Sequence, residues 1–295
     1  MEIFGVPLQS LAAQVFLGLV NGCFYALLSL GLAIIFGLLN VINLSHGALY
    51  MLGAFATWAG LNYFGLSYWW MLFLAPFIVG CFGVLIERMM LRRLYKLDHL
   101  YGMLLMIGLL HFLEGLFRLF YGVSGKSYSA PIELTGATDI GFMMLPNYRA
   151  WVVAVSIVVC FATWFAIEKT RLGATLRAST ENPELVDAFG VNVPMLVTLT
   201  YGFGAALAAF AGVLAAPMVQ VSPLMGANLI VAVFAVVVIG GLSSILGAII
   251  TGLALGVLEG LVSAFYPQVS ATIVFIVMAI ILLMRPSGLF GKESA

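Results

Sequence analysis

No aspartate, glutamate, lysine or arginine occurs from Ile3 to Ile86, an uninterrupted run of 84 residues. A second uncharged run extends over 71 residues, from Ala188 to Leu258. A helix needs about 20 apolar residues to cross a bilayer, so each run has room for roughly three crossings. Transmembrane β-strands alternate apolar and polar residues over about ten positions, and these runs are too continuously apolar for that. The sequence therefore predicts an all-α fold, a polytopic bundle of transmembrane helices.

The composition of the whole chain excludes the water-soluble classes. Only 8% of the residues are charged and 63% are hydrophobic, whereas soluble domains carry about 25% charged residues. A soluble enzyme and a nucleic-acid-binding protein are both excluded, because so few charges cannot cover a hydrated surface. The three cysteines all lie inside apolar runs, and their odd number does not suggest a disulfide framework.

Apolar runs and turn residues predict about eight or nine helices in a single transmembrane domain that spans residues 1–295. The predicted helices cover about 11–38, 42–63, 68–88, 100–121, 150–167 and 194–217, with two or three more between 227 and 284. Two polar stretches interrupt the series, an outer loop at about 122–149 and a cytoplasmic loop at about 168–193. The chain start carries no basic leader, so the first helix is expected to insert the chain.

Basic residues predict the orientation, because cytoplasmic loops of membrane proteins are enriched in lysine and arginine. Three basic residues fall on the outer side: Arg118, Lys126 and Arg149. The other nine follow the third helix, follow the fifth helix or close the chain: Arg88, Arg92, Arg93, Lys96, Lys169, Arg171, Arg177, Arg285 and Lys292. These segments are expected in the cytoplasm together with the C-terminus, and nine crossings would place the N-terminus outside.

Four polar residues inside the apolar runs are candidates for a translocation path. An ionisable group at the bilayer centre costs about 2.5–3.5 kcal/mol, and Glu259 lies far from any other charge. It either faces a water-filled path or partner helix, or is a structural carboxylate. Asn43, Ser45 and His46 must be satisfied by protein or water, so they mark a broken helix, a cavity lining or a contact at the cytoplasmic mouth. No second ligand accompanies His46 at metal-binding spacing, so no metal site is predicted.

A charged face occurs on the fourth predicted helix. His111, Glu114 and Arg118 share one helical face, and Glu114 and Arg118 have the spacing and order that favour an ion pair. A charge pair near the outer membrane surface and a substrate site are both compatible with this pattern, and the former is favoured.

The cytoplasmic loop carries the signals of a short helix. Asn182 suits an N-cap, Pro183 the first helical position and Glu184 the positive end of the dipole, while Gly190 suits the residue after the C-cap. The expected helix covers Pro183 to Phe189. It combines apolar with acidic side chains: Leu185, Val186, Ala188 and Phe189 with Glu184 and Asp187. It is either a docking element for another protein or a loop helix on the membrane surface.

Motifs along nearly the whole chain resemble the permease subunits of ABC importers for branched-chain amino acids. The segments that carry the resemblance, in order, are Asn21-Gly22, Tyr25-Ala26-Leu27, Asn43-x-Ser45-His46-Gly47, Met51-x-Gly53-Ala54, Glu87-Arg88, Arg92, Arg177-Ala178, Asn182, Ala188, Gly190-Val191-Asn192, Ala211-Gly212-Val213-Leu214, Gly240-Gly241-x-x-Ser244-x-x-Gly247-Ala248 and Glu259. One segment departs from the common importer pattern, because Glu-Ala-Ala followed by Gly is only partly present as Asp187-Ala188-Phe189-Gly190.

The resemblance implies a transport subunit rather than an enzyme, in a bacterial inner membrane. It implies a second permease (a paralogue or a second copy), two cytoplasmic ATPase subunits that hold ATP and Mg²⁺, and an extracytoplasmic binding protein. This chain itself would hold no cofactor. The residues of the short helix expected to seat in an ATPase groove are Asn182, Pro183, Glu184, Asp187, Ala188, Phe189 and Gly190.

The expected activity is translocation of leucine, isoleucine, valine or a related small polar solute by alternating access. Two other classes stay open, a secondary transporter, which would use inverted repeats, and a channel for small neutral solutes, which would need a repeated polar filter. A P-loop is excluded at Gly125-Lys126-Ser127, because Phe120 stands where that motif needs glycine.

Overall fold

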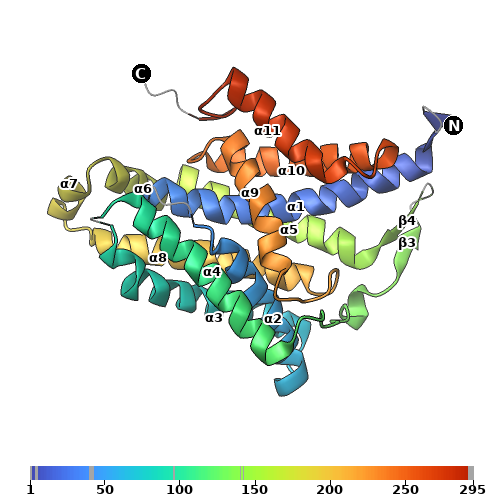
Figure 1. Cartoon of the computed structure of the whole chain (residues 1–295), viewed down its shortest axis with the longest axis horizontal. Helices are drawn as coiled ribbons and strands as arrows, with labels where there is room; N and C mark the ends of the chain where they lie inside the picture. The colour runs from blue at the N-terminus through green and yellow to red at the C-terminus, as the bar shows by residue number, and fades with distance from the viewer. Residues whose placement is uncertain are drawn as a thin grey trace. The chain divides into compact units, whose positions relative to one another are not determined.

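The computed structural model describes residues 2–3, 6–39, 43–95, 97–139, 141 and 143–291. Eleven α-helices lie in this part of the chain, with three short 3-10 turns and two small hairpins (Figure 1). The helices are α1 (Leu8–Leu39), α2 (His46–Phe64), α3 (Tyr68–Met89), α4 (His99–Tyr121), α5 (Asn147–Lys169), α6 (Arg171–Glu181), α7 (Pro183–Ala188), α8 (Val193–Ala215), α9 (Met225–Gly240), α10 (Ile245–Phe265) and α11 (Ile273–Met284).

The strands among the described residues form two antiparallel hairpins. β1 (Glu2–Ile3) pairs with β2 (Val6–Pro7), and β3 (Ala137–Asp139) pairs with β4 (Met144–Pro146) within the predicted outer loop. The 3-10 turns are η1 (Leu91–Arg93), η2 (Ile132–Leu134) and η3 (Ser270–Thr272). The fold is therefore the predicted all-α bundle.

The chain divides into two compact units, described separately below. Unit 1 comprises Met1–Ser29, Ala130–Phe161 and Ala232–Ala295, and unit 2 comprises Leu30–Ser129 and Ala162–Val231. Three helices, α1, α5 and α9, contribute residues to both units.

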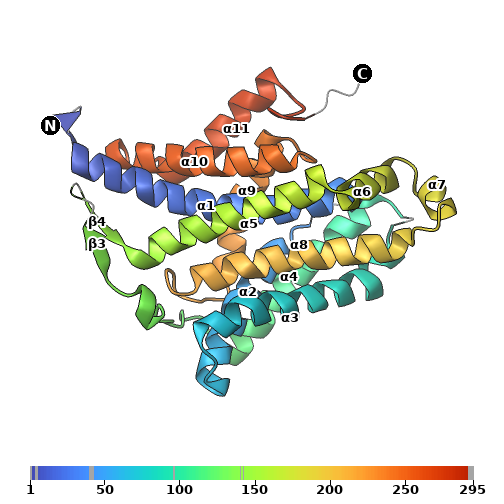
Figure 2. The same ribbon diagram turned by 180° about the vertical axis from the view of Figure 1, so that it is seen from behind.

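The core of unit 2 is formed by α8 packed against α2 and α3, and α3 and α8 run side by side in both ribbon views (Figures 1 and 2). Small residues make this packing possible. A Cβ on Gly53 of α2 would overlap the backbone of Ala209 of α8, and a Cβ on Gly80 of α3 would lie 3.1 Å from the carbonyl oxygen of Gly202. Close backbone approach is the usual way that membrane helices gain packing energy, because lipid supplies no hydrophobic driving force between them.

Unit 1 uses the same device between α1 and α10. A Cβ on Gly18 of α1 would lie within 3 Å of the backbone of Gly260, and one on Gly22 would lie 3.0 Å from the carbonyl oxygen of Leu253. From the other side, Gly252 meets the backbone of Ala26. The glycines that recur every four residues along α10 therefore form its contact face with α1.

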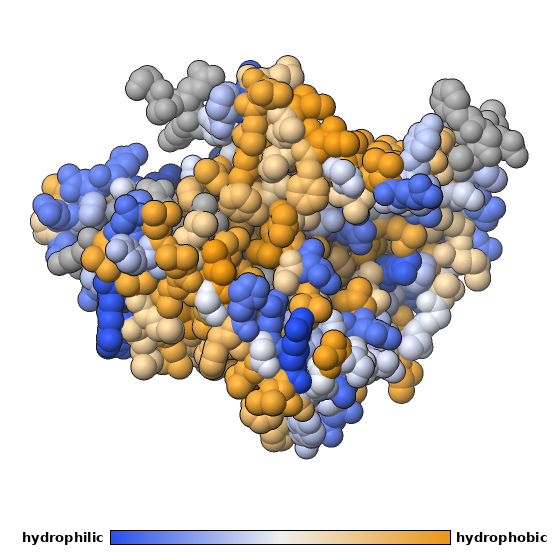
Figure 3. Space-filling model, in the orientation of Figure 1, coloured by the Kyte–Doolittle hydropathy of each residue, from blue (hydrophilic) through white to orange (hydrophobic). Residues whose placement is uncertain are grey.

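Six of the described helices are long and apolar enough to cross a membrane: α1, α3, α4, α5, α8 and α10. The shorter helices α9 and α11 are also apolar. Helix α2 is 19 residues long. Each predicted helix is thus present, and the region expected to hold two or three helices contains three, α9, α10 and α11. On the face that Figure 3 shows, hydrophobic side chains cover wide areas between hydrophilic patches, as expected for a protein in contact with lipid.

Two details of the helices were not predicted or cannot be compared with the prediction. The loop predicted to be cytoplasmic contains a helix that the sequence analysis missed, α6, because its 11 residues carry too few apolar positions to stand out as a run. The second helix begins at His46, whereas the predicted start, Ile42, lies outside the described residues, as do the basic residues Lys96 and Lys292.

Candidate functional site

A buried polar cluster lies where α2 begins. Asn43 and Ser45 immediately precede the helix and are 1% and 0% exposed. Ser45 Oγ donates to Asn43 Oδ1 at 2.6 Å, and Asn43 Nδ2 donates to the phenolic oxygen of Tyr201 on α8 at 3.2 Å. The Tyr201 hydroxyl lies 3.7 Å from the sulfur of Met106 on α4. These four residues, the Asn43 cluster, join three elements of unit 2 without using a charge.

His46 packs next to this cluster as the first residue of α2. Its backbone N–H donates to the carbonyl oxygen of Asn43 at 3.2 Å, and its side chain is fully buried. A Cβ on Gly31 of α1 would lie 2.9 Å from His46 Cε1 and 3.0 Å from the carbonyl oxygen of Gly204 on α8. The close approach of the imidazole therefore requires glycine at position 31. The structure thus brings three of the four predicted path candidates together in one packed interior.

A second cluster surrounds a buried carboxylate at the end of α3. Glu87 has no exposed surface. Tyr95 donates to its Oε1 at 2.9 Å, and Thr198 of α8 donates to its Oε2 at 2.5 Å. Arg92 approaches Oε1 at 3.4 Å and also donates to the hydroxyl of Thr198 at 2.5 Å. A buried charge is tolerated only when it is paired and hydrogen-bonded, and these four residues, the Glu87 cluster, meet that requirement.

The protonation of Tyr95 fits its role as a donor. Burial and the neighbouring carboxylate of Glu87 raise the pKa of Tyr95 above its ordinary value. The phenol therefore stays protonated and donates a hydrogen bond to Glu87.

Helix α8 connects the two clusters. Thr198 belongs to the Glu87 cluster and Tyr201 to the Asn43 cluster, and residues three positions apart lie on the same face of a helix. A displacement of the first turns of α8 would therefore act on both clusters.

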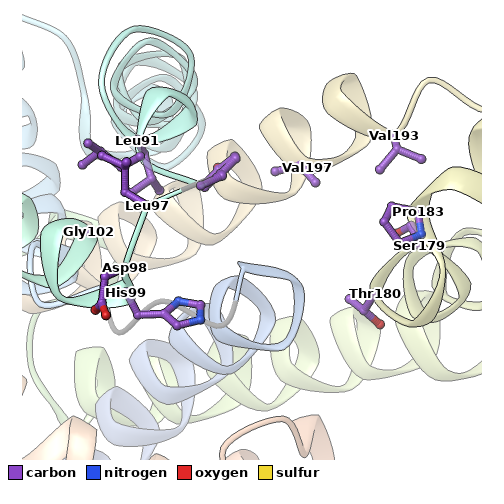
Figure 4. A pocket seen from close by; sticks show the side chains of 12 residues that line it. Leu91, Leu97, Asp98, His99, Gly102, Ser179, Thr180, Pro183, Val193 and Val197 are labelled. Carbon is purple, nitrogen blue, oxygen red and sulfur yellow. The ribbon is translucent and has the colours of Figure 1, made fainter.

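A cavity of about 250 Å³ adjoins the Glu87 cluster. Asp98 lies on one side of it, and Thr180 and Pro183, from the predicted cytoplasmic loop, lie across from it (Figure 4). Tyr95 both lines the cavity and donates to Glu87. Tyr95 thus connects the cavity that α6 and α7 line with the buried carboxylate of Glu87.

The short helix α7 has the caps that its sequence predicts. The side chain of Asn182 accepts from the backbone N–H of Leu185 at 3.0 Å, and Pro183 is the first helical residue. The helix ends at Ala188, one residue before the predicted end. Gly190 adopts φ +86°, a backbone conformation that residues with a Cβ rarely take.

One side of α7 faces outward with apolar groups. Phe189 is 79% exposed and Leu185 is 53% exposed, whereas Val186 is buried. The acidic residues Glu184 and Asp187 are exposed beside them. A projecting helix with apolar and acidic side chains has the chemistry of a surface that binds a protein.

The fourth path candidate, Glu259, lies in unit 1. Its Oε2 accepts a hydrogen bond from the hydroxyl of Tyr25 on α1 at 2.8 Å. Tyr25 is buried and Glu259 is half-buried. The carboxyl group therefore has a defined partner across the glycine-lined contact of α1 with α10.

The charged face of α4 differs from the expectation. Glu114 contacts His111, with 3.2 Å between Oε2 and Nδ1, and none of the ion pairs in the described part of the chain includes Arg118. The expected Glu114–Arg118 pair is therefore wrong. A helix offers partners at both three and four positions, and side-chain rotamers decide between them.

The sequence is similar to that of named membrane proteins. The family described as branched-chain amino acid transport system / permease component matches residues 14–284. The chain belongs to this family.

Individual relatives match over almost the full chain. The permease is 30% identical over 95% of its length to the high-affinity branched-chain amino acid transport system permease protein LivH of Escherichia coli, of which it covers 95%. It is 30% identical over 93% of its length to BraD of Pseudomonas aeruginosa, covering 94% of that protein. It is 28% identical over 90% of its length to a probable LivH of Methanocaldococcus jannaschii, covering 88%.

Family membership and the apolar helices establish the general role of the chain. It is a multi-pass inner-membrane permease, a non-enzymatic component of an ABC transporter that works with partner subunits. Among the described residues, no group of three or more histidine, cysteine or acidic side chains could hold a metal ion.

Sequence reasoning missed several residues of the two clusters. Tyr201 and Thr198 are polar groups within an otherwise apolar helix, and a buried tyrosine hydroxyl usually finds a partner, so both carried a usable signal. Met106 and Tyr95 carried none, because their roles depend on contacts with distant segments.

Proposed function

We propose that this permease forms part of the membrane path of an ATP-driven importer for leucine, isoleucine, valine or a related small polar solute. The observation that carries the proposal is the family match over residues 14–284. The named relatives from Escherichia coli and Pseudomonas aeruginosa are permeases of high-affinity branched-chain amino acid transport systems. This relationship favours the importer over a secondary transporter or channel that works without ATPase partners.

The proposed assembly has two permeases, two cytoplasmic ATPase subunits and an extracytoplasmic binding protein. The second permease is a paralogue or a second copy of this chain. ATP and Mg²⁺ are assigned to the ATPase subunits, and no cofactor is assigned to the permease. In this assembly the binding protein delivers the solute, and the two permeases form the path.

Helix α7 is the proposed contact with an ATPase. Its exposed Phe189 and Leu185 supply apolar surface for a groove, and Glu184 and Asp187 supply charge at the rim. Asn182, Pro183, Ala188 and Gly190 set where the helix starts and stops. Interfaces of this kind are strongest where aromatic side chains fill pockets.

The Glu87 cluster is the proposed link from α7 to the path. ATP binding would move α7, whose Pro183 lines the same cavity as Tyr95, and Tyr95 donates a hydrogen bond to Glu87. Thr198 and Tyr201 would carry this displacement along α8 to Asn43, Ser45 and His46. A ligand can drive a conformational change only through contacts that differ between the two states, and the hydrogen bonds of these clusters are suitable contacts. Glu259, paired with Tyr25, is the candidate in unit 1.

The proposed orientation places α7 and the C-terminus in the cytoplasm. The contact of Arg92 with the carbonyl oxygen of Pro194, at 3.0 Å, supports the placement of α7, because it brings a basic segment against the start of α8. Arg177 lies on α6, in the same loop as α7. Two basic segments thus gather at one end of unit 2, as the distribution of lysine and arginine in membrane proteins requires of a cytoplasmic end.

Purification of the tagged permease from native membranes in mild detergent, followed by mass spectrometry, tests the proposal. Two ATPases and a sister permease are the expected partners, and the purified complex should import leucine into liposomes when ATP and its binding protein are supplied. A lone or self-associated chain that moves solute without ATP would overturn the proposal and indicate a secondary transporter or channel.

A further inference from the structure

One exposed face of α4 carries two polar side chains, His111 near the middle of the helix and Arg118 in its last turn. Leu104, Gly108, His111, Gly115 and Arg118 follow one another at intervals of four and three residues, so they form one stripe, here called the α4 stripe. His111 lies about 18 Å along the helix from its start and about 15 Å from its end, at a rise of 1.5 Å per residue. Its side chain is 69% exposed. In Figure 3, hydrophilic side chains lie among apolar ones in the region of α4 and the loop that follows it.

The exposed face of α3 in the same unit has the composition expected of a surface in contact with lipid. Phe73, Phe77, Cys81 and Leu85 recur there every four residues, and all are exposed. None is charged or strongly polar. The α4 stripe differs in kind, because it has an imidazole and a guanidinium, and charged groups in contact with lipid are costly.

The glycines of the α4 stripe face open space. A Cβ on Gly108 or Gly115 would meet no atom within 4 Å outside its own helix backbone. The glycines that pack helices together in unit 2 behave differently, since a Cβ on Gly53 or Gly80 would meet the backbone of α8. Within unit 2, the described residues therefore leave room beside the α4 stripe.

Glu114 adds a buried acceptor with unused capacity. Its side chain is 8% exposed, and its Oε2 contacts His111 Nδ1 at 3.2 Å. Its Oε1 has no hydrogen-bond partner among the described residues. A buried carboxylate oxygen without a partner is costly, and a donor at this position would remove the cost.

We infer that the α4 stripe, with Glu114, lines the translocation path and recognises the zwitterionic head of the passing solute. Glu114 Oε1 accepts from the ammonium group, and Arg118, about 6 Å further along the axis, pairs with the carboxylate. His111 holds Glu114 through its other oxygen. The two charges of an α-amino acid thus meet opposite charges on adjacent turns of one helix. This inference rests on the proposed import function.

Thiol labelling in the assembled transporter, with each single variant in its native membrane, tests whether the α4 stripe meets water. Gly108→Cys and Gly115→Cys introduce thiols at its open positions, and the native Cys81 on the exposed face of α3 is the internal control for lipid contact. A charged methanethiosulfonate should modify the introduced thiols much faster than Cys81, and saturating leucine with the binding protein should slow the reaction. Labelling no faster than that of Cys81, or unaffected by leucine, would overturn the inference.

Transport by charge-removing variants provides the second test. Glu114→Gln and Arg118→Gln should each lower leucine uptake per assembled complex about tenfold, equivalent to about 1.4 kcal/mol. Arg118→Lys keeps the charge and should restore part of the uptake. Glu133→Gln, an exposed carboxylate in η2, is the matched control and should have no effect.

The outcomes separate the inference from the proposed function. Normal uptake by Glu114→Gln and Arg118→Gln in a wild-type complex that imports leucine would overturn the inference alone. A wild-type complex that fails to import leucine would count against the proposed function, and the thiol labelling without leucine would still report whether the α4 stripe meets water.

Discussion

The hydroxyl of Thr198 lies 2.5 Å from Oε2 of Glu87, although 111 positions separate the two residues in the chain. The bond fixes the start of α8 to the end of α3 next to the cavity that α6 and α7 also line. Because Glu87 is fully buried, each of its hydrogen bonds offsets part of the cost of removing a carboxylate from water. The contact therefore combines a structural role with a position suited to transmit movement.

Thr198→Val should destabilise the permease. The substitution keeps the shape of the side chain but removes a donor from Glu87 and an acceptor from Arg92. The expected loss in the free energy of unfolding is about 1–3 kcal/mol, the cost of leaving a buried polar group partly unsatisfied. Thermal unfolding of the purified protein in detergent measures it. Thr180→Val, at an exposed position whose hydroxyl bonds within α6, should change stability by at most about 0.5 kcal/mol, and equal effects of both variants would contradict the role of Thr198.

Tyr201→Phe should impair transport more than assembly. The phenolic oxygen accepts from Asn43 Nδ2 at 3.2 Å, so its removal leaves a buried amide without that acceptor. We expect leucine uptake per assembled complex to fall about tenfold, because a change of about 1.4 kcal/mol in the balance of two states shifts their ratio by that factor. Tyr101→Phe, on the exposed side of α4, should leave uptake at its wild-type rate. Wild-type uptake by Tyr201→Phe would remove the Asn43 cluster from the transport cycle.

Hydrophobic runs and turn residues predict the helices of this permease, but not the contacts between distant segments. The packing face of α10 has a local signal, because Gly252, Gly256 and Gly260 recur every four residues within one helix. Asn43 and Ser45 were recognisable as needing partners, yet the partner Tyr201 is 158 positions from Asn43. Nothing local indicates such a pairing.

The misassigned partner of Glu114 shows a second limit of sequence reasoning. Spacing permits both His111 and Arg118, and only the rotamers in the folded protein decide for His111. Helix α6 shows a third limit of sequence reasoning, because a short polar helix has no apolar run from which it could be predicted. The caps of α7 were predictable for the opposite reason, because capping acts within a few residues.

Two glycine-to-alanine substitutions should change stability in opposite directions. Gly53→Ala places a Cβ against the backbone of Ala209, where neither helix can yield without losing packing, and overpacking of this kind costs about 1–3 kcal/mol. Gly108→Ala meets no atom within 4 Å and should stabilise α4 by about 0.5–1 kcal/mol, because alanine loses less backbone entropy than glycine in a helix. Unfolding temperatures of the two variants, measured in one detergent, test the difference. A stabilising Gly53→Ala would show that α2 and α8 are less closely packed than described.

Ala188→Arg should uncouple ATP hydrolysis from transport. Ala188 is the last residue of α7 and is exposed, so the folded permease alone tolerates a larger side chain there. In the proposed complex the same position faces an ATPase, where burying an unpaired guanidinium is strongly unfavourable. We expect leucine uptake to fall at least tenfold, which corresponds to a loss of about 1.4 kcal/mol in the free energy of the contact with the ATPase. The ATPase stimulation that the loaded binding protein causes should also be lost. Ala174→Arg, at an exposed position of α6, is the matched control and should keep both activities. Uptake and stimulated ATPase activity that stay at wild-type levels in Ala188→Arg would mean that the ATPase contacts the permease elsewhere.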